Sequence, residues 1–301
     1  MKILHNTAER RAAVLASLAD VRFPSIDADR PQALLARCPV EATTPLVDAP
    51  ALAARARVAQ VHVKDERGRM GLGSFKALGA AYVIARDAEA GIAKGKTYVT
   101  ASAGNHGLSV AAGAAAFGAH AVIYLAETVP EAFADRLRDI GATVVRHGAI
   151  YEQSMAGAAA AAAENVWALL SDSSWPGYFD RPYTLMEGYL ALMQETVSQM
   201  DAPPTHIFLQ AGVGGLAAAS AAYARHAWGA APRIIVVEPD AAPALYASVQ
   251  AGSAQVTTGP ASDMGRLDCK EPSLIALKGL ARDADDFMLI TENEGAAGSA
   301  A

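Results

Sequence analysis

Hydrophobic and polar positions follow two alternating patterns along the chain from about residue 94 onward. Short apolar runs of strand length recur, and helix-length segments rich in small or periodic apolar residues separate them. The predicted strands cover residues 96–102, 120–126, 142–148, 205–212, 233–239 and 287–291. Strands that alternate with helices imply right-handed crossovers and a mostly parallel sheet, so this pattern predicts an α/β fold.

Helices are predicted in the segments between these runs. One of them has Pro130 at its start and Gly141 just past its end, the positions that these residues prefer in helices. Another, from 151 to 167, is rich in alanine, the strongest helix former. The remaining predicted helices cover residues 104–118, 184–200 and 216–228.

The N-terminal segment, residues 1–21, mixes apolar positions with charged ones and is predicted to form an amphipathic helix rather than a signal peptide. The longest run of small apolar residues, 110–126, contains two glycines and a histidine. A helix followed by a buried strand explains this run better than a membrane span does. We therefore expect a soluble protein with no membrane partner.

Composition narrows the possible classes further. The 301 residues are 52% hydrophobic, which is enough for a large core, and the net charge of −6 is mild. Basic residues are scattered, so no nucleic-acid partner is expected. The two cysteines, Cys38 and Cys269, form no CxxC pair, which suits the reducing cytoplasm. No spacing typical of zinc ligands is present, and no metal is expected.

A glycine-rich turn, "QAGVGGLAAAS", joins the predicted strand at 205–212 to the helix after it. Gly212, Gly214 and Gly215 allow successive backbone amides to point at one anion, most often a phosphate. Close strand–helix packing is one alternative. A dinucleotide site is another, because Glu238 ends the next strand. The spacing to Glu238 is long, however, and the full GxGxxG pattern is missing.

A second turn, "TASAGNHG", also joins a strand end to a helix start. Ser102, Gly104 and the nearby amides are suited to receive a carboxylate, and Asn105 to hydrogen-bond an oxygen of an aromatic cofactor. An ordinary capped helix is the alternative. In "GLGSFKALGAAY", Lys76 stands between glycines and a small apolar run. Its stem could simply pack while its amine reaches water.

A phosphate cradle, a carboxylate cradle and a partly buried lysine together match the needs of pyridoxal 5′-phosphate (PLP). This cofactor requires a lysine for its Schiff base, donors for its phosphate and a partner for its ring. Burial is expected to lower the pKa of Lys76 and to make its amine a nucleophile and a proton carrier.

The motifs "GSFKALGA", "SAGNHG" and "AGVGG" resemble the lysine, substrate and phosphate segments of fold-type II PLP enzymes, the tryptophan synthase β superfamily. The resemblance extends over nearly the whole chain from about Thr43. It implies two interwoven domains, each a mostly parallel twisted sheet flanked by helices. Residues 1–77 and 188–301 would form the larger, PLP-binding domain and residues 78–187 a smaller, mobile one. It also implies a homodimer.

Within this superfamily, "SDSSWPGYFDRPYTLMEGY" and "DMGRLDCKEPS" most resemble diaminopropionate ammonia-lyases. The resemblance implies that Lys76 carries PLP and that Asp172 does acid–base work, although a loop aspartate bonded to backbone amides is the alternative for Asp172. The resemblance also implies a set of binding residues. These are Asn105, Gly212, Val213, Gly214, Gly215, Leu216 and Glu294 for the cofactor, and Ser102, Ala103, Gly104 and His106 for the substrate.

The chain departs from the lyase pattern at two places. Ala103 replaces an aspartate of the substrate loop, which makes "SAGNHG" more similar to serine/threonine dehydratases. Near residue 294 the pattern is shortened, and Glu294 takes the serine position that faces the pyridine nitrogen. His206 and Cys269 are interpreted as structural, and Glu238 as a cap of the loop after its strand.

The expected activity is a PLP-dependent α,β-elimination that converts a small polar amino acid to a 2-oxo acid and ammonia. A serine/threonine dehydratase is the alternative within the same chemistry. Two alternatives come from other classes: a nicotinamide-dependent oxidoreductase, and a PLP-fold protein that binds a ligand without turnover.

Overall fold

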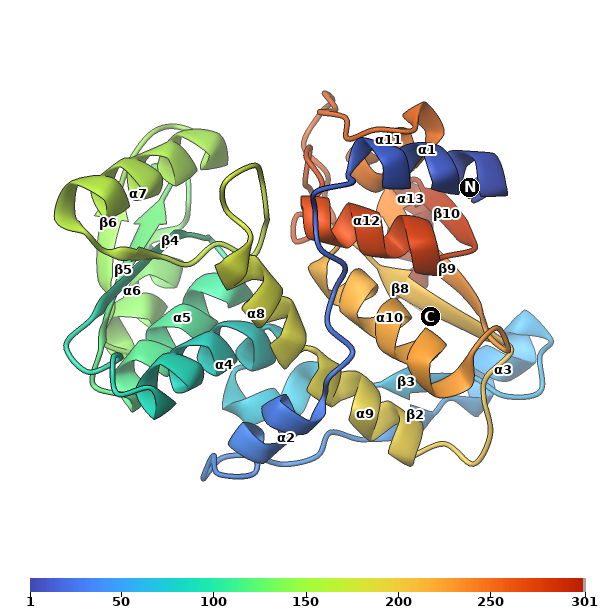
Figure 1. Ribbon diagram of the computed structural model, residues 1–301, viewed down its shortest axis with the longest axis horizontal. Coiled ribbons are helices and arrows are strands. Elements are labelled where there is room, and N and C mark those ends of the chain that lie inside the picture. The colour runs from blue at the N-terminus through green and yellow to red at the C-terminus, as the bar shows by residue number, and fades with distance from the viewer. Residues whose placement is uncertain (300–301) are drawn as a thin grey trace.

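The computed structural model describes residues 1–299, and its strands form two four-stranded sheets and one two-stranded ribbon (Figure 1). The first sheet has the order β6-β5-β4-β7 and is parallel throughout. Its strands are β4 (Thr97–Ala101), β5 (His120–Leu125), β6 (Thr143–Arg146) and β7 (Ala168–Leu169).

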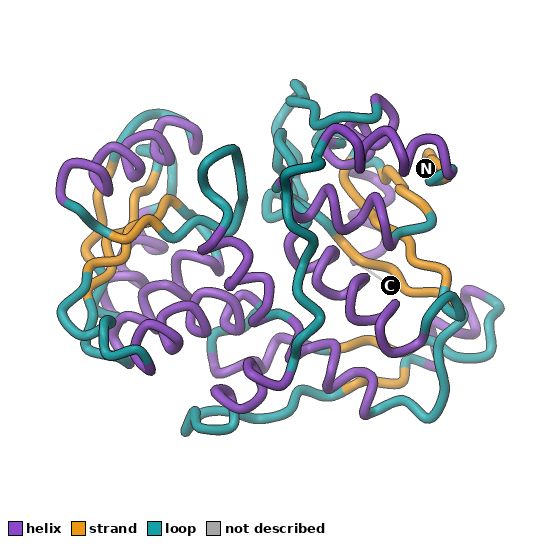
Figure 2. The backbone as a smooth tube through the Cα atoms, in the orientation of Figure 1, coloured by secondary structure: helices purple, strands orange, loops and turns teal. Residues whose placement is uncertain are grey.

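Helices cover this first sheet on both faces (Figure 2). Helix α7 packs against β4 and β5, and α5 packs against the same strands below them, in contact with α4. The helices of this lobe are α4 (Lys76–Glu89), α5 (Asn105–Ala116), α6 (Glu131–Asp139), α7 (Tyr151–Asn165) and α8 (Asp180–Gly188).

The second sheet has the order β1-β10-β9-β8, in which β8, β9 and β10 are parallel and β1 is antiparallel to β10. Its strands are β1 (Lys2–His5), β8 (His206–Gln210), β9 (Arg233–Pro239) and β10 (Asp286–Ile290). The helices around it are α1 (Ala8–Ser17), α9 (Leu190–Ser198), α10 (Gly215–Trp228), α11 (Ala244–Ala251), α12 (Leu274–Asp283) and α13 (Glu292–Ser299).

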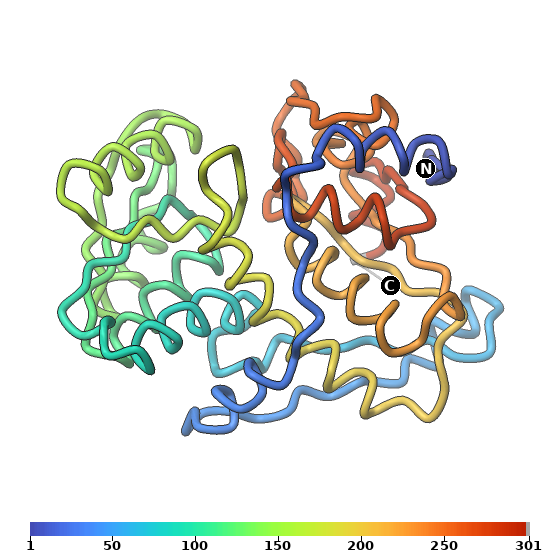
Figure 3. Tube along the Cα trace, in the orientation of Figure 1, coloured from blue at the N-terminus to red at the C-terminus, as the bar shows by residue number. Residues whose placement is uncertain are grey.

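A smaller region lies beneath the second sheet and contains the two-stranded ribbon. Its elements are α2 (Asp29–Leu35), β2 (Leu46–Asp48), α3 (Pro50–Ala56), β3 (His62–Lys64) and the 3₁₀ helix η1 (Glu66–Gly71). The path of the chain places both β1, near the N-terminus, and α13 in the lobe of the second sheet (Figure 3). Over residues 1–299, no helix combines the length and the apolar character needed to cross a bilayer.

The α/β prediction with mostly parallel sheets is confirmed, but the N-terminal prediction is partly wrong. Residues 2–5 form the edge strand β1 instead of the first turn of a helix, because they pair with β10 from Lys2↔Leu289 to His5↔Asp286. Helix α1 begins only after Thr7, whose side chain accepts a hydrogen bond from the Arg10 amide and caps the helix.

The segment 184–200 was expected to be one helix and instead forms parts of α8 and α9. Close packing against α4 accompanies the break. A Cβ on Gly188 would lie 2.3 Å from the Leu78 carbonyl oxygen, and one on Gly79 would lie 2.7 Å from the Tyr189 ring. The two glycines therefore let α4 and α8 approach closely, which brings Tyr189 beside the first turn of α4.

Candidate active site

Lys76 and Asp172 form an ion pair where the two lobes meet. Lys76 is the first residue of α4, and Asp172 lies in the loop after β7. The Lys76 Nζ donates a hydrogen bond to Asp172 Oδ2 at 2.5 Å. The side chains are 23% and 19% exposed, so both charges are largely removed from water. A charge-assisted bond of this length fixes the amine in one place.

The electrostatics of this pair correct the expectation for Lys76. Burial disfavours its charged form, but the negative charge and hydrogen bond of Asp172 outweigh burial and raise the pKa of Lys76 above its usual range. Burial likewise favours the neutral acid at Asp172, and the Lys76 charge overrides it, holding the Asp172 pKa well below its usual range. The pair therefore stores a proton on the amine beside an ionised acceptor.

Two aromatic rings form the apolar surroundings of the amine. The Lys76 Nζ lies 5.4 Å from the Phe75 ring centroid and 5.9 Å from that of Tyr189. The two rings meet edge to face, with centroids 5.2 Å apart. Burial raises the pKa of Tyr189 to about 12, so its hydroxyl stays neutral at ordinary pH. Sequence reasoning missed Tyr189, because its segment shows only helical periodicity.

The glycine loop that follows β8 reaches the same place. Gly214 has φ +97° and is the N-cap of α10, so the first-turn amides of this helix have no side-chain cap. A Cβ placed on Gly215 would lie 3.8 Å from the backbone oxygen of Asp172. One placed on Gly212 would lie 2.8 Å from Cys269 Sγ. Uncapped amides at a helix start form a positive cradle for an anion, close to the ion pair.

Cys269 closes the other side of the glycine loop. Its side chain is half-buried, and desolvation together with the Asp172 charge raises the pKa of its thiol to about 11. A protonated thiol is a poor nucleophile. The structure therefore agrees with the structural interpretation of Cys269 and adds that it packs on Gly212.

The loop before α5, residues 102–104, precedes His106 and is shaped by hydrogen bonds to Ser102. Ser102 Oγ accepts hydrogen bonds from the amides of Gly104 and Gly107, at 3.3 and 3.1 Å, so it shapes the turn. Asn105 is half-buried at the first position of α5, and Ala103 is exposed.

The structure places His106 behind this loop. It is 5% exposed, and its Nε2 lies 2.8 Å from the Leu170 carbonyl oxygen. Burial lowers the His106 pKa, which keeps the ring neutral. The Leu170 contact links His106 to the segment that carries Asp172, so its geometry is that of a support for that segment.

A pair of serines anchors the segment of Asp172 to the other lobe. Ser174 Oγ and Ser273 Oγ lie 2.7 Å apart, and both are buried. Ser174 Oγ also accepts a hydrogen bond from the amide of Ile275, in the first turn of α12. These bonds tie the loop after β7 to α12, and sequence reasoning did not identify them.

The two glutamates considered from the sequence both have hydrogen-bond partners within the protein. Glu238 is 1% exposed and accepts hydrogen bonds from the amides of Leu245 and Tyr246, each at 2.8 Å. It therefore caps α11, and its carboxylate is committed to that helix rather than to a ribose. The Glu294 carboxylate accepts a hydrogen bond from the Met1 amine at 2.8 Å, next to the edge strand β1.

A family of known enzymes matches most of the chain. The family model described as "Pyridoxal-phosphate dependent enzyme" matches residues 38–301. The chain belongs to this PLP-dependent enzyme family. The family assignment favours PLP over a nicotinamide at the glycine loop.

Several relatives within the family share most of the chain. It is 33% identical over 268 residues to a diaminopropionate ammonia-lyase from Salmonella typhimurium, covering 80% of this chain and 66% of that enzyme. The chain therefore spans about two thirds of the length of this relative. A chloroplastic threonine dehydratase from Arabidopsis thaliana is 34% identical over 179 residues, covering 60% of this chain and 28% of the plant protein.

The fold is also that of a solved ammonia-lyase. The Escherichia coli diaminopropionate ammonia-lyase, crystallised with an aminoacrylate–PLP azomethine reaction intermediate, superposes with a TM-score of 0.84 at 29% identity. The match covers 96% of this chain and 76% of that one. The PLP enzyme fold predicted from the sequence is therefore confirmed.

Proposed function

We propose that this PLP-dependent enzyme is an ammonia-lyase that catalyses α,β-elimination from a small polar amino acid. With 2,3-diaminopropionate and one molecule of water, the products would be pyruvate and two molecules of ammonia. The proposal rests on the identity to the ammonia-lyases and on one geometric observation. An amine and a carboxylate lie 2.5 Å apart, beside a glycine cradle suited to a phosphate.

The residues of the site fit PLP. Lys76 would supply the amine that binds the cofactor, the amides from Gly212 to Leu216 at the uncapped start of α10 would hold its phosphate, and Asn105 at the start of α5 would bond to its ring oxygen. At Gly212 the cradle leaves no room for a side chain, since a Cβ there would lie 2.8 Å from Cys269 Sγ. When bound, PLP supplies a conjugated ring that withdraws electrons from the substrate Cα.

Lys76 would carry the protons of the reaction beside an ionised Asp172. A neutral Lys76 amine would remove the substrate α-proton, and the Asp172 carboxylate beside it would stabilise the ammonium that forms. That ammonium would then hold a proton for the departing β-group, while the ionised Asp172 is suited to bind a positively charged β-amine of the substrate. Phe75 and Tyr189 keep water from the amine on one side, which strengthens each of these interactions.

Chromophore formation and product release test this proposal together. Purified protein with PLP should show an absorbance band that borohydride abolishes, and peptide mapping should find the label on Lys76. Ammonia and 2-oxo acid should then form from 2,3-diaminopropionate. A Lys76→Ala variant should lose the fixed label and at least about 10³-fold in rate. Labelling without turnover on any amino acid would instead favour the non-catalytic binder.

Ala103 supports a second candidate, a serine/threonine dehydratase. Its position in the substrate loop carries no carboxylate, so nothing at residue 103 itself would hold a second substrate amine. A hydroxyl would then be the leaving group. A panel of D- and L-diaminopropionate, serine and threonine separates the candidates, because the ratio of kcat/KM values identifies the preferred leaving group.

The proposal extends to the state of the protein in the cell. Residues 1–77 with 188–301 would form the PLP-binding domain and 78–187 the mobile domain, in a cytoplasmic homodimer. The two separate sheets and the chain's resemblance to fold-type II enzymes support this. Light scattering after gel filtration would measure the mass of the holoenzyme. A monomeric mass would contradict the proposed homodimer.

A further inference from the structure

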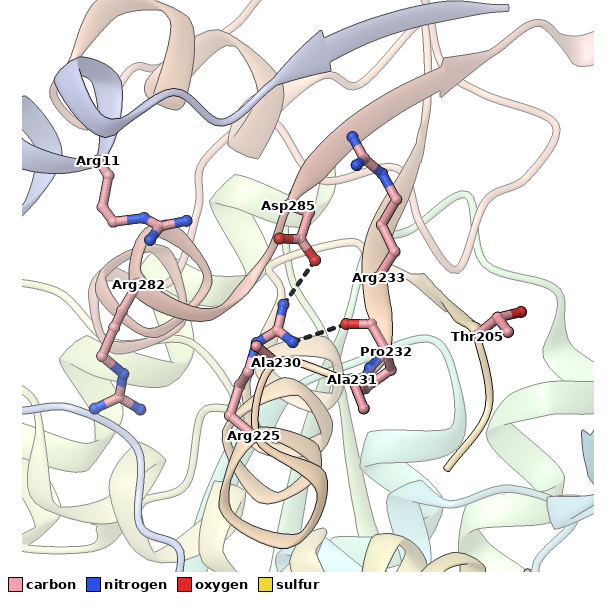
Figure 4. Close-up of a pocket in the computed structure, with 9 residues that line it drawn as sticks. All are labelled: Arg11, Thr205, Arg225, Ala230, Ala231, Pro232, Arg233, Arg282 and Asp285. Carbon is pink, nitrogen blue, oxygen red and sulfur yellow. Dashed lines mark hydrogen bonds and ion pairs between the residues drawn. The ribbon is translucent and has the colours of Figure 1, made fainter. Parts of the chain in front are cut away.

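A cavity of about 330 Å³ lies at the far end of the second sheet from the glycine loop (Figure 4). The glycine loop follows the carboxyl end of β8, whereas this cavity is built around Arg233, the first residue of β9. Arginine dominates its lining. The lining residues are Arg11, Thr205, Arg225, Ala230, Ala231, Pro232, Arg233, Arg282 and Asp285.

Two of these arginines are neutralised by neighbouring aspartates. Arg225 Nη2 donates to Asp285 at 2.6 Å, and its other nitrogens bond to backbone carbonyls. Arg233 donates to both carboxylate oxygens of Asp286, at 2.5 and 2.8 Å. These pairs hold the walls of the cavity in place and leave little net charge of their own.

The ion pair between Arg282 and Asp283 points away from the cavity. Arg282 bonds to both carboxylate oxygens of Asp283, and its guanidinium lies 4.3 Å from the Phe23 ring centroid. In Figure 4 its guanidinium points away from Asp285. Arg282 therefore contributes backbone and stem to the lining rather than a free donor.

Arg11 is the exception among the four. Within residues 1–299 its side chain has no hydrogen-bond or ion-pair partner, and its Nε is buried without one. Figure 4 shows it reaching from α1 toward the side of the cavity where Asp285 lies. A desolvated guanidinium nitrogen without an acceptor is unfavourable, and among residues 1–299 no carboxylate pairs with the positive charge of Arg11.

We propose that this cavity binds a small anion through a phosphate or carboxylate group, with Arg11 as its principal contact. A guanidinium matches either group through two parallel N–H donors. Arg233 lines the same cavity, and its Nη1, which takes no part in the pair with Asp286, adds donors. The site is distinct from the PLP cradle and does not depend on the proposed reaction.

The two anion sites stand at opposite ends of one helix. Gly214 caps the start of α10 in the PLP cradle, and Arg225 lies in its last turn at this cavity. At about 1.5 Å per residue, the 14 residues of α10 separate them by roughly 21 Å. Phosphate binding at the cavity can therefore be measured while PLP fills the cradle.

Thermal unfolding of the PLP-saturated holoenzyme tests the proposal. Inorganic phosphate would be titrated against chloride at equal ionic strength, in the wild type, in Arg11→Gln and in Arg136→Gln, a matched control at an exposed arginine of α6. Phosphate should raise the Tm of the wild type and of the control by about 3 °C or more beyond chloride. It should raise that of Arg11→Gln by less than half as much.

Calorimetric titration of phosphate gives a second measure. Arg11→Gln should raise the Kd for phosphate at least tenfold. Arg11→Lys keeps the positive charge but loses the two parallel N–H donors, so its Kd should lie between those of the wild type and Arg11→Gln. Repeating the titration with acetate identifies whether a carboxylate binds through the same residue. An equal Tm shift in the wild type and Arg11→Gln, or no specific shift in the wild type, would overturn the proposal. So would an Arg11→Gln protein that is clearly less stable without phosphate.

Discussion

The Lys76 amine and the Asp172 carboxylate are 96 positions apart in the sequence and 2.5 Å apart in the structure. Each of the two groups stays ionised in its largely buried position because the opposite charge stabilises it. Removing one partner of such a pair leaves an uncompensated charge, which shifts toward its neutral form. The pair therefore links the nucleophilicity of the amine to the state of one carboxylate.

Asp172→Asn should separate cofactor capture from catalysis. Burial lowers the pKa of Lys76, and without the Asp172 carboxylate the main opposing influence is lost, so this pKa falls. The apoprotein should therefore capture PLP with a pH midpoint lower than that of the wild type. Elimination should slow by about 10²- to 10⁴-fold, because the carboxylate that stabilises the Lys76 ammonium is lost. Stopped-flow absorbance against pH gives the first result and pyruvate release the second. Asp268→Asn, whose carboxylate pairs with Lys270, is the control that should change neither.

Gly212→Ala should weaken PLP binding through a single clash. The new Cβ would lie 2.8 Å from Cys269 Sγ, closer than real contacts allow, so the loop must shift. We expect Kd for PLP to rise at least about tenfold. Adding Cys269→Ala removes the sulfur and should recover part of the affinity, although Leu267 Cα remains at 3.4 Å. If the double variant binds no better than Gly212→Ala, the sulfur is not the obstacle.

Glu238→Gln should flatten the dependence of stability on pH. Burial raises the pKa of Glu238 from its ordinary 4.5 to about 8 in the folded chain. Between these values the folded state holds a proton that the unfolded state has lost, so stability falls as pH rises through this window. Urea unfolding from pH 5 to 8 should show this decline in the wild type and a smaller one in Glu238→Gln. The exposed Glu9→Gln serves as control, and a decline of equal slope in all three proteins would exclude Glu238 as its source.

Ser174→Ala should reduce catalysis more than the substitution of a surface serine does. The substitution leaves the buried Ile275 amide without an acceptor, at a cost of about 1–3 kcal/mol. Because the same loop carries Asp172, kcat should fall as well. A double-mutant cycle with Ser273→Ala should give a coupling energy of about 0.5–3 kcal/mol by urea unfolding. Ser198→Ala in α9 is the matched control, and a coupling near zero would mean that the serines act independently.

Sequence reasoning identified the parts of the site that have a local signature. Lys76, Ser102 and Gly212 to Gly215 all lie where a strand ends or a helix begins, in short segments of unusual composition. The carboxyl ends of parallel strands share one edge, so these segments converge once the α/β pattern is recognised.

The contacts between distant segments could not be predicted. Ser174 and Ser273 are 99 positions apart, and neither is unusual in its own neighbourhood. The break before Tyr189 coincides with close packing of Gly188 on the backbone of Leu78 in another helix, although the local sequence favours one continuous helix. The rise in the Lys76 pKa had the same origin, because burial can be inferred from composition whereas the distance to Asp172 cannot.

The edge strand β1 has a consequence for handling the protein. It runs beside β10 and occupies hydrogen-bonding groups that would otherwise face solvent at the end of the sheet. A chain trimmed through Asn6 would present the bare flank of β10 to any other extended polypeptide, and such flanks recruit strands from neighbouring molecules. Loss of a few terminal residues would thus be felt as self-association and precipitation, even though Lys76 and its cofactor loop would be untouched.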